Sequence, residues 1–104
     1  MRILVVDNHI EGVSMISDIL SGHDIDGKIV CEYNSKYDLA IIDYKHIEFV
    51  NFKIPTIIMS ARGNIETEID ALENGAIRFI SKPISPPLLK TYVELAKPKH
   101  WWKF

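Results

Sequence analysis

The sequence has little of what marks several common protein classes. It contains one cysteine, Cys31, so no internal disulfide can form, and a reducing compartment is expected. Twelve lysines and arginines stand against fourteen acidic residues, which gives no electrostatic reason to expect a nucleic-acid partner. No apolar run approaches the roughly 20 residues that span a bilayer, and no signal-peptide pattern opens the chain. We therefore expect a cytoplasmic protein without a membrane span.

Common catalytic motifs and repeats are also missing from the sequence. The four histidines show no metal-ligand spacing, and no Ser-His-Asp or Cys-His arrangement is suggested. What the chain does have is the composition of one globular domain, with 47% hydrophobic and 25% charged residues. We place this domain at residues 1–98 and treat residues 99–104, which are basic and aromatic, as a C-terminal tail.

Apolar runs alternate with amphipathic runs along the chain. Uninterrupted apolar or β-branched runs, typical of buried strands, lie at residues 3–6, 39–42 and 56–59, and residues 77–80 are a further strand candidate that contains Arg78. Helical periodicity follows three of these runs, and Gly22, Gly75 and Pro98 are placed to end the three helices. Strands that alternate with helices predict an α/β domain with a parallel sheet.

Two segments do not fit this alternation. Residues 28–33 are a further strand candidate, but only residues 34–37 separate them from the next strand. A parallel crossover normally needs about a dozen residues or more, so no helix fits there, and we expect this strand to be short, irregular or antiparallel. Residues 44–53 are too irregular for a helix of any length, and we expect a single turn or loop.

Polar residues follow the strand-like runs where open α/β sheets bind their ligands. These residues are Asp7, Asn8, Asp43, Ser60 and Lys82. Carboxylate and amide oxygens suit Mg²⁺, whereas a lysine and a hydroxyl suit phosphoryl oxygens. The pattern predicts a polar pocket for a divalent cation and a phosphoryl group. Each residue alone has a simpler interpretation: Asp43 as a strand-ending turn residue, and Asn8 as a helix cap.

The sequence resembles the receiver domains of bacterial two-component response regulators. The resemblance rests on residues 3–7, 39–43, 57–61 and 75–83, and the spacing from Pro55 to Pro83 matches the family without a gap. It implies a flavodoxin-like three-layer sandwich with a mostly parallel sheet of four to five strands in the order 2-1-3-4-5. In this chain we expect the second helix to be absent and the third to be reduced.

The resemblance also implies roles for single residues. Asp43 would be the phospho-acceptor, attacking the phosphorus of a phosphohistidine or a small phosphodonor. Asp7, Asn8 and the backbone carbonyl of Lys45 would hold Mg²⁺. Asn8 stands where the family usually has a second acidic residue, so we expect weak Mg²⁺ affinity, because an amide removes one negative charge.

Further positions match the family around the expected phosphoryl group. Ser60 and Lys82 would bind that group. Phe79 would be the aromatic switch residue, although a core aromatic is an equal alternative. Arg62 would border the pocket, as would Lys45, and both are basic here. Their charges could replace missing metal charge.

The missing helices would leave part of one apolar sheet face uncovered, which soluble monomers avoid. We expect Phe49, Phe52 and the tail, with Trp101, Trp102 and Phe104, to cover this face, or else a second subunit or a partner.

Other α/β families fit the sequence less well. A flavodoxin would need a phosphate-binding loop after the first strand, and residues 7–11 are acidic and have no glycine run. A haloacid-dehalogenase-type phosphatase would place its second acid at position 9, where His9 stands.

The favoured function is a signalling or interaction module without an output domain. It would be an atypical pseudo-receiver that acts by protein contact largely independently of phosphorylation. One alternative is a phospho-accepting single-domain response regulator that uses Asp43 and Mg²⁺, and another is a structural subunit of a larger assembly. We expect no enzymatic activity beyond self-phosphorylation from a phosphodonor and self-dephosphorylation. The expected partners are a histidine kinase, a phosphotransfer protein, another signalling protein, or a second copy in a homodimer.

Overall fold

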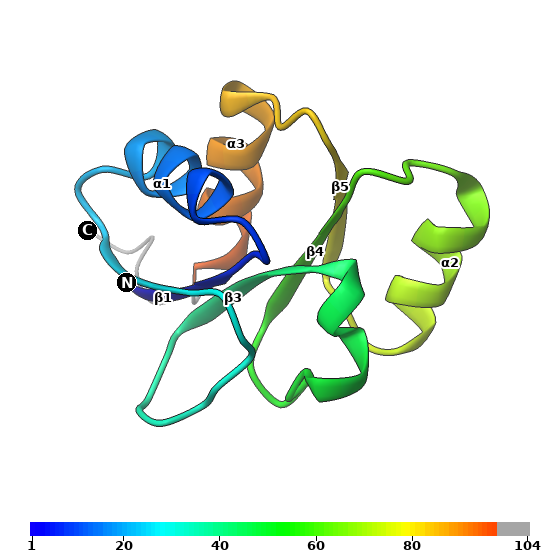
Figure 1. Cartoon of the computed structure of the whole chain (residues 1–104), viewed down its shortest axis with the longest axis horizontal. Helices are drawn as coiled ribbons and strands as arrows, with labels where there is room; N and C mark the ends of the chain where they lie inside the picture. The colour runs from blue at the N-terminus through cyan, green and yellow to red at the C-terminus, as the bar shows by residue number, and fades with distance from the viewer. Residues whose placement is uncertain (98–104) are drawn as a thin grey trace.

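Five parallel strands form one sheet in the order β2-β1-β3-β4-β5. The computed structural model describes residues 1–97, and Figure 1 shows the sheet between two layers of helices. The strands are β1 (Arg2–Val6), β2 (Asp24–Lys28), β3 (Leu39–Asp43), β4 (Thr56–Ser60) and β5 (Arg78–Ser81). The helices are α1 (Ile10–Ile19), α2 (Ile65–Glu73), α3 (Pro86–Ala96) and the 3₁₀ helix η1 (Tyr44–Phe49). The predicted flavodoxin-like sheet and strand order are confirmed.

The central strands are buried on both faces, as their uninterrupted apolar sequences predict. Every residue of β3 and β4 is buried, and so are four of the five residues of β1. The register aligns Val5 with Ile41 and Ile41 with Ile57, so successive side chains alternate between two hydrophobic clusters. The ends of these strands are thereby fixed at one edge of the sheet, with Asp43 closing β3.

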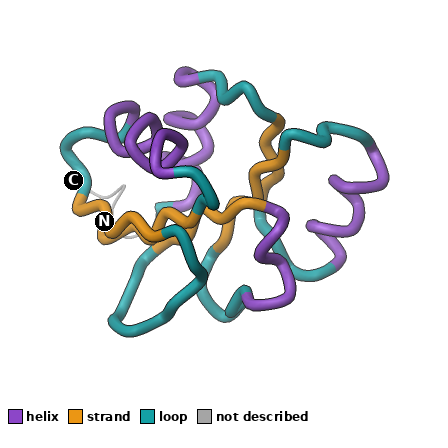
Figure 2. Tube along the Cα trace, viewed as in Figure 1, coloured by secondary structure: helices purple, strands orange, loops and turns teal. Residues whose placement is uncertain are grey.

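The two faces of the sheet are covered in different ways (Figure 2). On the first face, Ile16 and Leu20 at and just after α1, with Leu89 and Val93 from α3, pack against the sheet in one cluster. The second face carries α2 and η1. Between β2 and β3 no helix is present among residues 29–38, and η1 replaces the helix expected after β3, so the predicted loss of one helix and reduction of another are confirmed.

The second face is covered by aromatic side chains from loops. Phe52 packs against its cluster, as predicted, together with Tyr33 and Tyr37 from the β2–β3 connection. Phe49 does not, because its side chain is 66% exposed, so that part of the prediction is wrong. Val50, the extended residue that ends η1, packs against this cluster instead. The aromatic tail at 99–104 lies outside the described residues.

The prediction for the second strand is wrong in position. The strand spans Asp24–Lys28 instead of residues 28–33, and it runs parallel to β1, not antiparallel. Residues 29–38 then connect β2 to β3, so the connection is longer than the residues 34–37 that the sequence pattern left for it. Because β2 lies at the sheet edge, its sequence is polar, and Asp26 accepts a hydrogen bond from the hydroxyl of Tyr37.

Helix boundaries follow local signals at α2 but not at α1. Asn64 caps α2 by accepting a hydrogen bond from the backbone N–H of Thr67 at 2.8 Å, and Gly75, at a φ of 116°, follows its end. The N-cap of α1 is His9, whose side chain makes no capping bond. The interpretation of Asn8 as a cap is therefore wrong. Within residues 1–97, no helix is long and apolar enough to cross a membrane.

The helix α2 exposes its apolar stripe. Its buried residues are the small side chains Thr67 and Ala71. Ile65, Ile69 and Leu72, which share one side of the helix by their spacing, are 66%, 46% and 43% exposed. The second face therefore binds α2 through small side chains and leaves its large ones to solvent.

Candidate functional site

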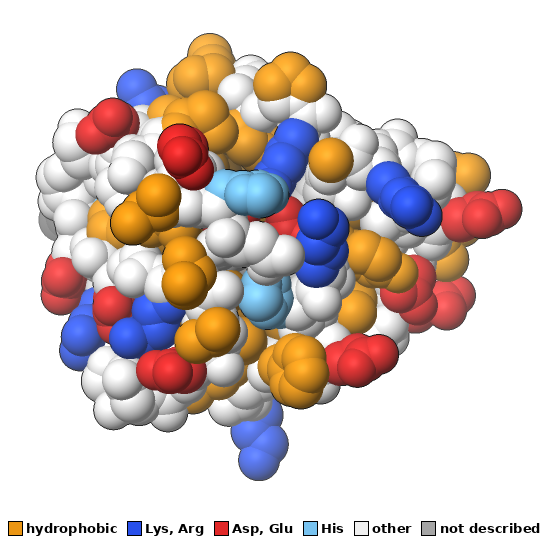
Figure 3. All heavy atoms as spheres, viewed as in Figure 1, with side chains coloured by type: hydrophobic (Ala, Val, Ile, Leu, Met, Phe, Trp, Pro, Cys, Tyr) orange, Lys and Arg blue, Asp and Glu red, His pale blue; other side chains and the backbone are white. Residues whose placement is uncertain are grey.

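The polar residues at or just after the ends of β1, β3, β4 and β5 meet in one cleft, as predicted. The cleft has a volume of about 980 Å³, and Asp7, Asp43, Ser60 and Lys82 line it. In Figure 3, basic and histidine side chains surround a small acidic patch near the centre of the visible face. Because parallel strands end at the same edge, residues separated by up to 75 positions in sequence come into contact.

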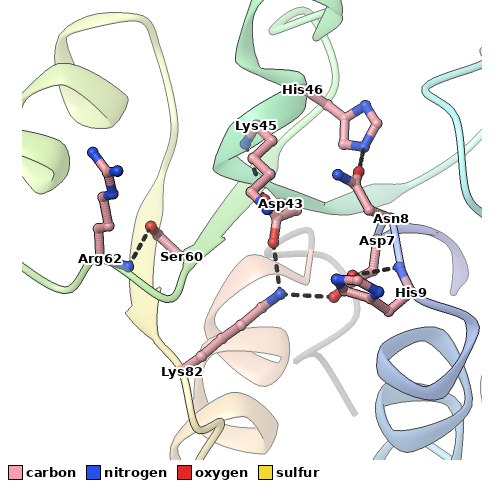
Figure 4. A network of polar contacts seen from close by, with 9 residues as sticks. All are labelled: Asp7, Asn8, His9, Asp43, Lys45, His46, Ser60, Arg62 and Lys82. Carbon is pink, nitrogen blue, oxygen red and sulfur yellow. Dashed lines mark hydrogen bonds and ion pairs between the residues drawn. The ribbon is translucent and has the colours of Figure 1, made fainter.

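Lys82 lies between the two carboxylates (Figure 4). Its Nζ is 2.6 Å from Oδ2 of Asp43 and 2.8 Å from Oδ2 of Asp7. The carboxylate side chains are 8% and 3% exposed, and that of Lys82 is 24% exposed. Two acids and one ammonium leave a net charge near -1, so the lysine neutralises about half of the buried charge.

The electrostatics of the cleft follow from this pairing. Burial alone would raise the pKa of Asp7, but the hydrogen bonds from Lys82 and the His9 backbone outweigh it and lower that pKa. Burial alone would lower the pKa of Lys82, but its hydrogen bonds to Asp43 and Asp7 outweigh it and raise that pKa. Both groups therefore stay ionised at neutral pH.

The other carboxylate oxygens are also hydrogen-bonded. Oδ1 of Asp7 accepts from the backbone N–H of His9 at 2.9 Å, and Oδ1 of Asp43 accepts from the backbone N–H of Lys45 at 3.0 Å. Gly12, which the sequence pattern did not single out, leaves room for Asp7, because a Cβ there would lie 2.5 Å from Oδ2. Every oxygen of the two acids thus has a partner in the protein.

Asn8 is not part of the acidic pair. Its side chain is exposed, and its Oδ1 contacts Nε2 of His46, a residue of η1 (Figure 4). Within residues 1–97, no group of three His, Cys, Asp or Glu side chains is placed to hold a metal ion. Among the carboxylates of residues 1–97, those of Asp7 and Asp43 form ion pairs with Lys82.

Ser60 and Arg62 lie on the opposite wall of the cleft. Oγ of Ser60 accepts from the backbone N–H of Arg62 at 2.9 Å, which leaves the hydroxyl hydrogen available for another acceptor. The guanidinium of Arg62 points away from the acids in Figure 4. Phe79 is half-buried against the cluster of the second face, which fits its interpretation as a core aromatic.

One contact in the cleft was missed from the sequence. The hydroxyl of Tyr44, the residue after Asp43, donates to Oδ2 of Asp70 in α2, and this bond raises the pKa of Tyr44. Both residues line the cleft. The two residues are 26 positions apart, and no local pattern pairs them.

Comparisons with known proteins find similarity to response regulators and to receiver domains. No family model matches it. The transcriptional regulatory protein ZraR of Salmonella typhimurium is 27% identical over 113 aligned positions, which cover 90% of this chain and 26% of ZraR. The chain thus spans about a quarter of the length of this curated relative.

Solved structures agree with the sequence comparison. NtrX of Brucella abortus, in complex with ADP, superposes with a TM-score of 0.79 at 26% identity, over 91% of this chain and 25% of NtrX. The receiver domain of a LuxO repressor protein of Vibrio parahaemolyticus superposes with a TM-score of 0.79 at 23% identity, over 91% of this chain and 88% of that domain. At 23% identity, the similarity to this second structure supports the fold alone.

Proposed function

The chain has the receiver fold and is related to response regulators, and from this premise we propose that it is an atypical receiver. It acts by protein contact, largely independently of phosphorylation. The observation that carries this proposal is the pairing of Lys82 with both Asp7 and Asp43, in a cleft that has an amide in place of a third carboxylate. We propose no enzymatic activity beyond self-phosphorylation and self-dephosphorylation.

The charge balance argues for weak Mg²⁺ binding. Oxygen ligands suit Mg²⁺, and Asp7, Asp43 and the backbone carbonyl of Lys45 are the groups that would hold it. One divalent cation would then share two carboxylates with the ammonium of Lys82, which repels it. Asn8 adds no negative charge and is bonded to His46. A divalent cation therefore binds more weakly here than in a cleft with three acidic side chains.

The exposed stripe of α2 supports contact with a protein. Ile65, Ile69 and Leu72 form an apolar surface that a helix or a second copy of the chain can bury. The stripe lies on α2, which also contributes Asp70 to the lining of the cleft. We propose that a signalling protein or a homodimer partner binds at this stripe.

One observation favours phospho-acceptance as the alternative. Asp43, Ser60 and Lys82 line the same cleft. In that mechanism an oxygen of Asp43 attacks phosphorus, the bond from phosphorus to the donor's leaving group breaks, and an acyl phosphate forms. A bound Mg²⁺ would supply charge neutralisation for this step. Lys82 would move from the carboxylates to the phosphoryl oxygens, and the Ser60 hydroxyl would donate to one of them.

Mass spectrometry separates the two functions. The whole chain is incubated with acetyl phosphate and Mg²⁺, and its intact mass is measured beside that of Asp43→Asn. We expect no phosphoryl adduct on either protein. An adduct on the unmodified chain that is lost in Asp43→Asn would replace the proposal with the alternative.

A further inference from the structure

Two side-chain contacts connect η1 to its neighbours on either side of the cleft. Tyr44 bonds to Asp70 in α2, and His46 contacts Asn8 in the β1–α1 loop. η1 begins at the residue after Asp43, and Asp43 itself is its N-cap. The segment next to the expected phospho-acceptor is therefore attached to α2 by a side chain.

The contact between Tyr44 and Asp70, here called the Tyr44–Asp70 bridge, is well supported on both sides. The ring of Tyr44 packs against the cluster of the second face, which fixes the direction of its hydroxyl. Asp70 accepts from Nδ2 of Asn74 at 3.3 Å through Oδ1, and the backbone carbonyl of Asp70 accepts from the same nitrogen at 2.7 Å. The contacts with Asn74 thus help to orient the carboxylate of Asp70 independently of Tyr44.

Apart from this bridge, α2 is attached to the sheet through small side chains. Its buried residues are Thr67 and Ala71, and neither removes much apolar area from water. A hydrogen bond from a hydroxyl to an ionised carboxylate is directional and stronger than one between neutral groups. For α2 the bridge is therefore a second attachment beside the apolar packing.

We propose that Tyr44 and Asp70 are a positioning pair. Their hydrogen bond holds α2 against the segment that follows Asp43, so α2 presents its exposed stripe in one position without a phosphoryl group on Asp43. The inference rests on the proposed function, because that function makes the α2 stripe the contact surface. The Tyr44 and Asp70 side chains thereby keep that surface in a constant position.

Amide hydrogen exchange of the full chain tests this pair. Tyr44→Phe keeps the packed ring and removes the hydroxyl. The matched control is Tyr37→Phe, which removes the hydroxyl that bonds to Asp26 away from α2. We expect Tyr44→Phe to speed exchange of the α2 amides roughly three- to tenfold, the range of one hydrogen bond, and Tyr37→Phe to leave them unchanged.

A double variant shows whether the effect belongs to the pair. Asp70→Ala should speed exchange in α2 at least as much as Tyr44→Phe does, because it removes the same bond and also the side-chain contact with Asn74. The combination should add little to Asp70→Ala alone, because the Tyr44 hydroxyl then has no carboxylate to bind. Unchanged α2 exchange in both single variants would overturn the inference, as would equal acceleration of all amides. These measurements use no phosphodonor, so an acetyl phosphate adduct would refute the proposed function and leave this result standing.

Discussion

The two faces of the sheet are stabilised by different means. On the first face, large apolar side chains from α1 and α3 interdigitate with the sheet in one buried cluster. On the second face, loop aromatics cover the sheet, and α2 is attached by two small residues and the Tyr44–Asp70 bridge. The first face therefore has the packing of a stable core, and the second face has the weaker attachment expected of a surface that takes part in function.

The largest expected effect is on the first face. Leu89 is fully buried in α3, so Leu89→Ala should lower the free energy of unfolding by about 4 kcal/mol through lost burial and a cavity. Urea denaturation followed by circular dichroism measures the change. A loss below about 1 kcal/mol would mean that α3 is not the stable side of the molecule.

Removal of the central lysine should come next. Lys82→Met leaves two buried carboxylates without their cation, and we expect a loss of about 3 kcal/mol at pH 7. The comparison variant is Lys36→Met, at an exposed loop residue, which should change stability by less than about 0.5 kcal/mol.

The pH dependence of stability tests the contact between Lys82 and Asp7 more sharply. The pKa of Asp7 is lowered on folding, so its stabilisation is present above its unfolded pKa near 3.8 and is lost as pH falls through the lower folded value. The pKa of Lys82 is raised, so its stabilisation is present below 10.5 and is lost as pH rises through the higher folded value. In Lys82→Met, acid should stabilise the protein, because protonation relieves the repulsion between the carboxylates. Urea midpoints at pH 7 and near pH 4 test this reversal.

On the second face, Phe52 and Phe49 form a matched pair. Phe52 packs against the cluster, so Phe52→Ala should cost about 2 kcal/mol, roughly half of a full core truncation. Phe49 is mostly exposed, so Phe49→Ala should change stability by less than about 0.5 kcal/mol. Equal losses in thermal or urea unfolding would contradict the assignment of Phe52 as the covering residue.

The smallest effect concerns the start of α2. Asn64→Ala removes the capping bond to Thr67 and should cost about 1 kcal/mol. Asn64→Ser retains a capping oxygen and should restore most of the loss. If the loss appears in α2 hydrogen exchange before global unfolding, α2 opens separately from the first face.

The sequence predicted the central strands because burial on both faces leaves a continuous apolar pattern, as in residues 39–42. It also predicted that Asp7, Asp43, Ser60 and Lys82 would meet, since parallel strand ends share an edge. The pairing of Tyr44 with Asp70 was not predictable, because contacts between distant polar side chains follow no period. The contact of Asn8 with His46 was not predictable for the same reason, since the two residues lie 38 positions apart.

The edge strand β2 has a further consequence for how the molecule behaves in a crowded solution. Its sequence Asp24–Lys28 is polar, and this is why the strand was missed. A sheet edge offers unpaired backbone groups to any other chain in an extended form, and charged side chains are a common protection against such aggregation. Asp24, Asp26 and Lys28 place charge along this edge, and Arg78 does so on β5 at the other. The charges that conceal β2 from pattern analysis are also of the kind that disfavours the pairing of a further strand at this edge.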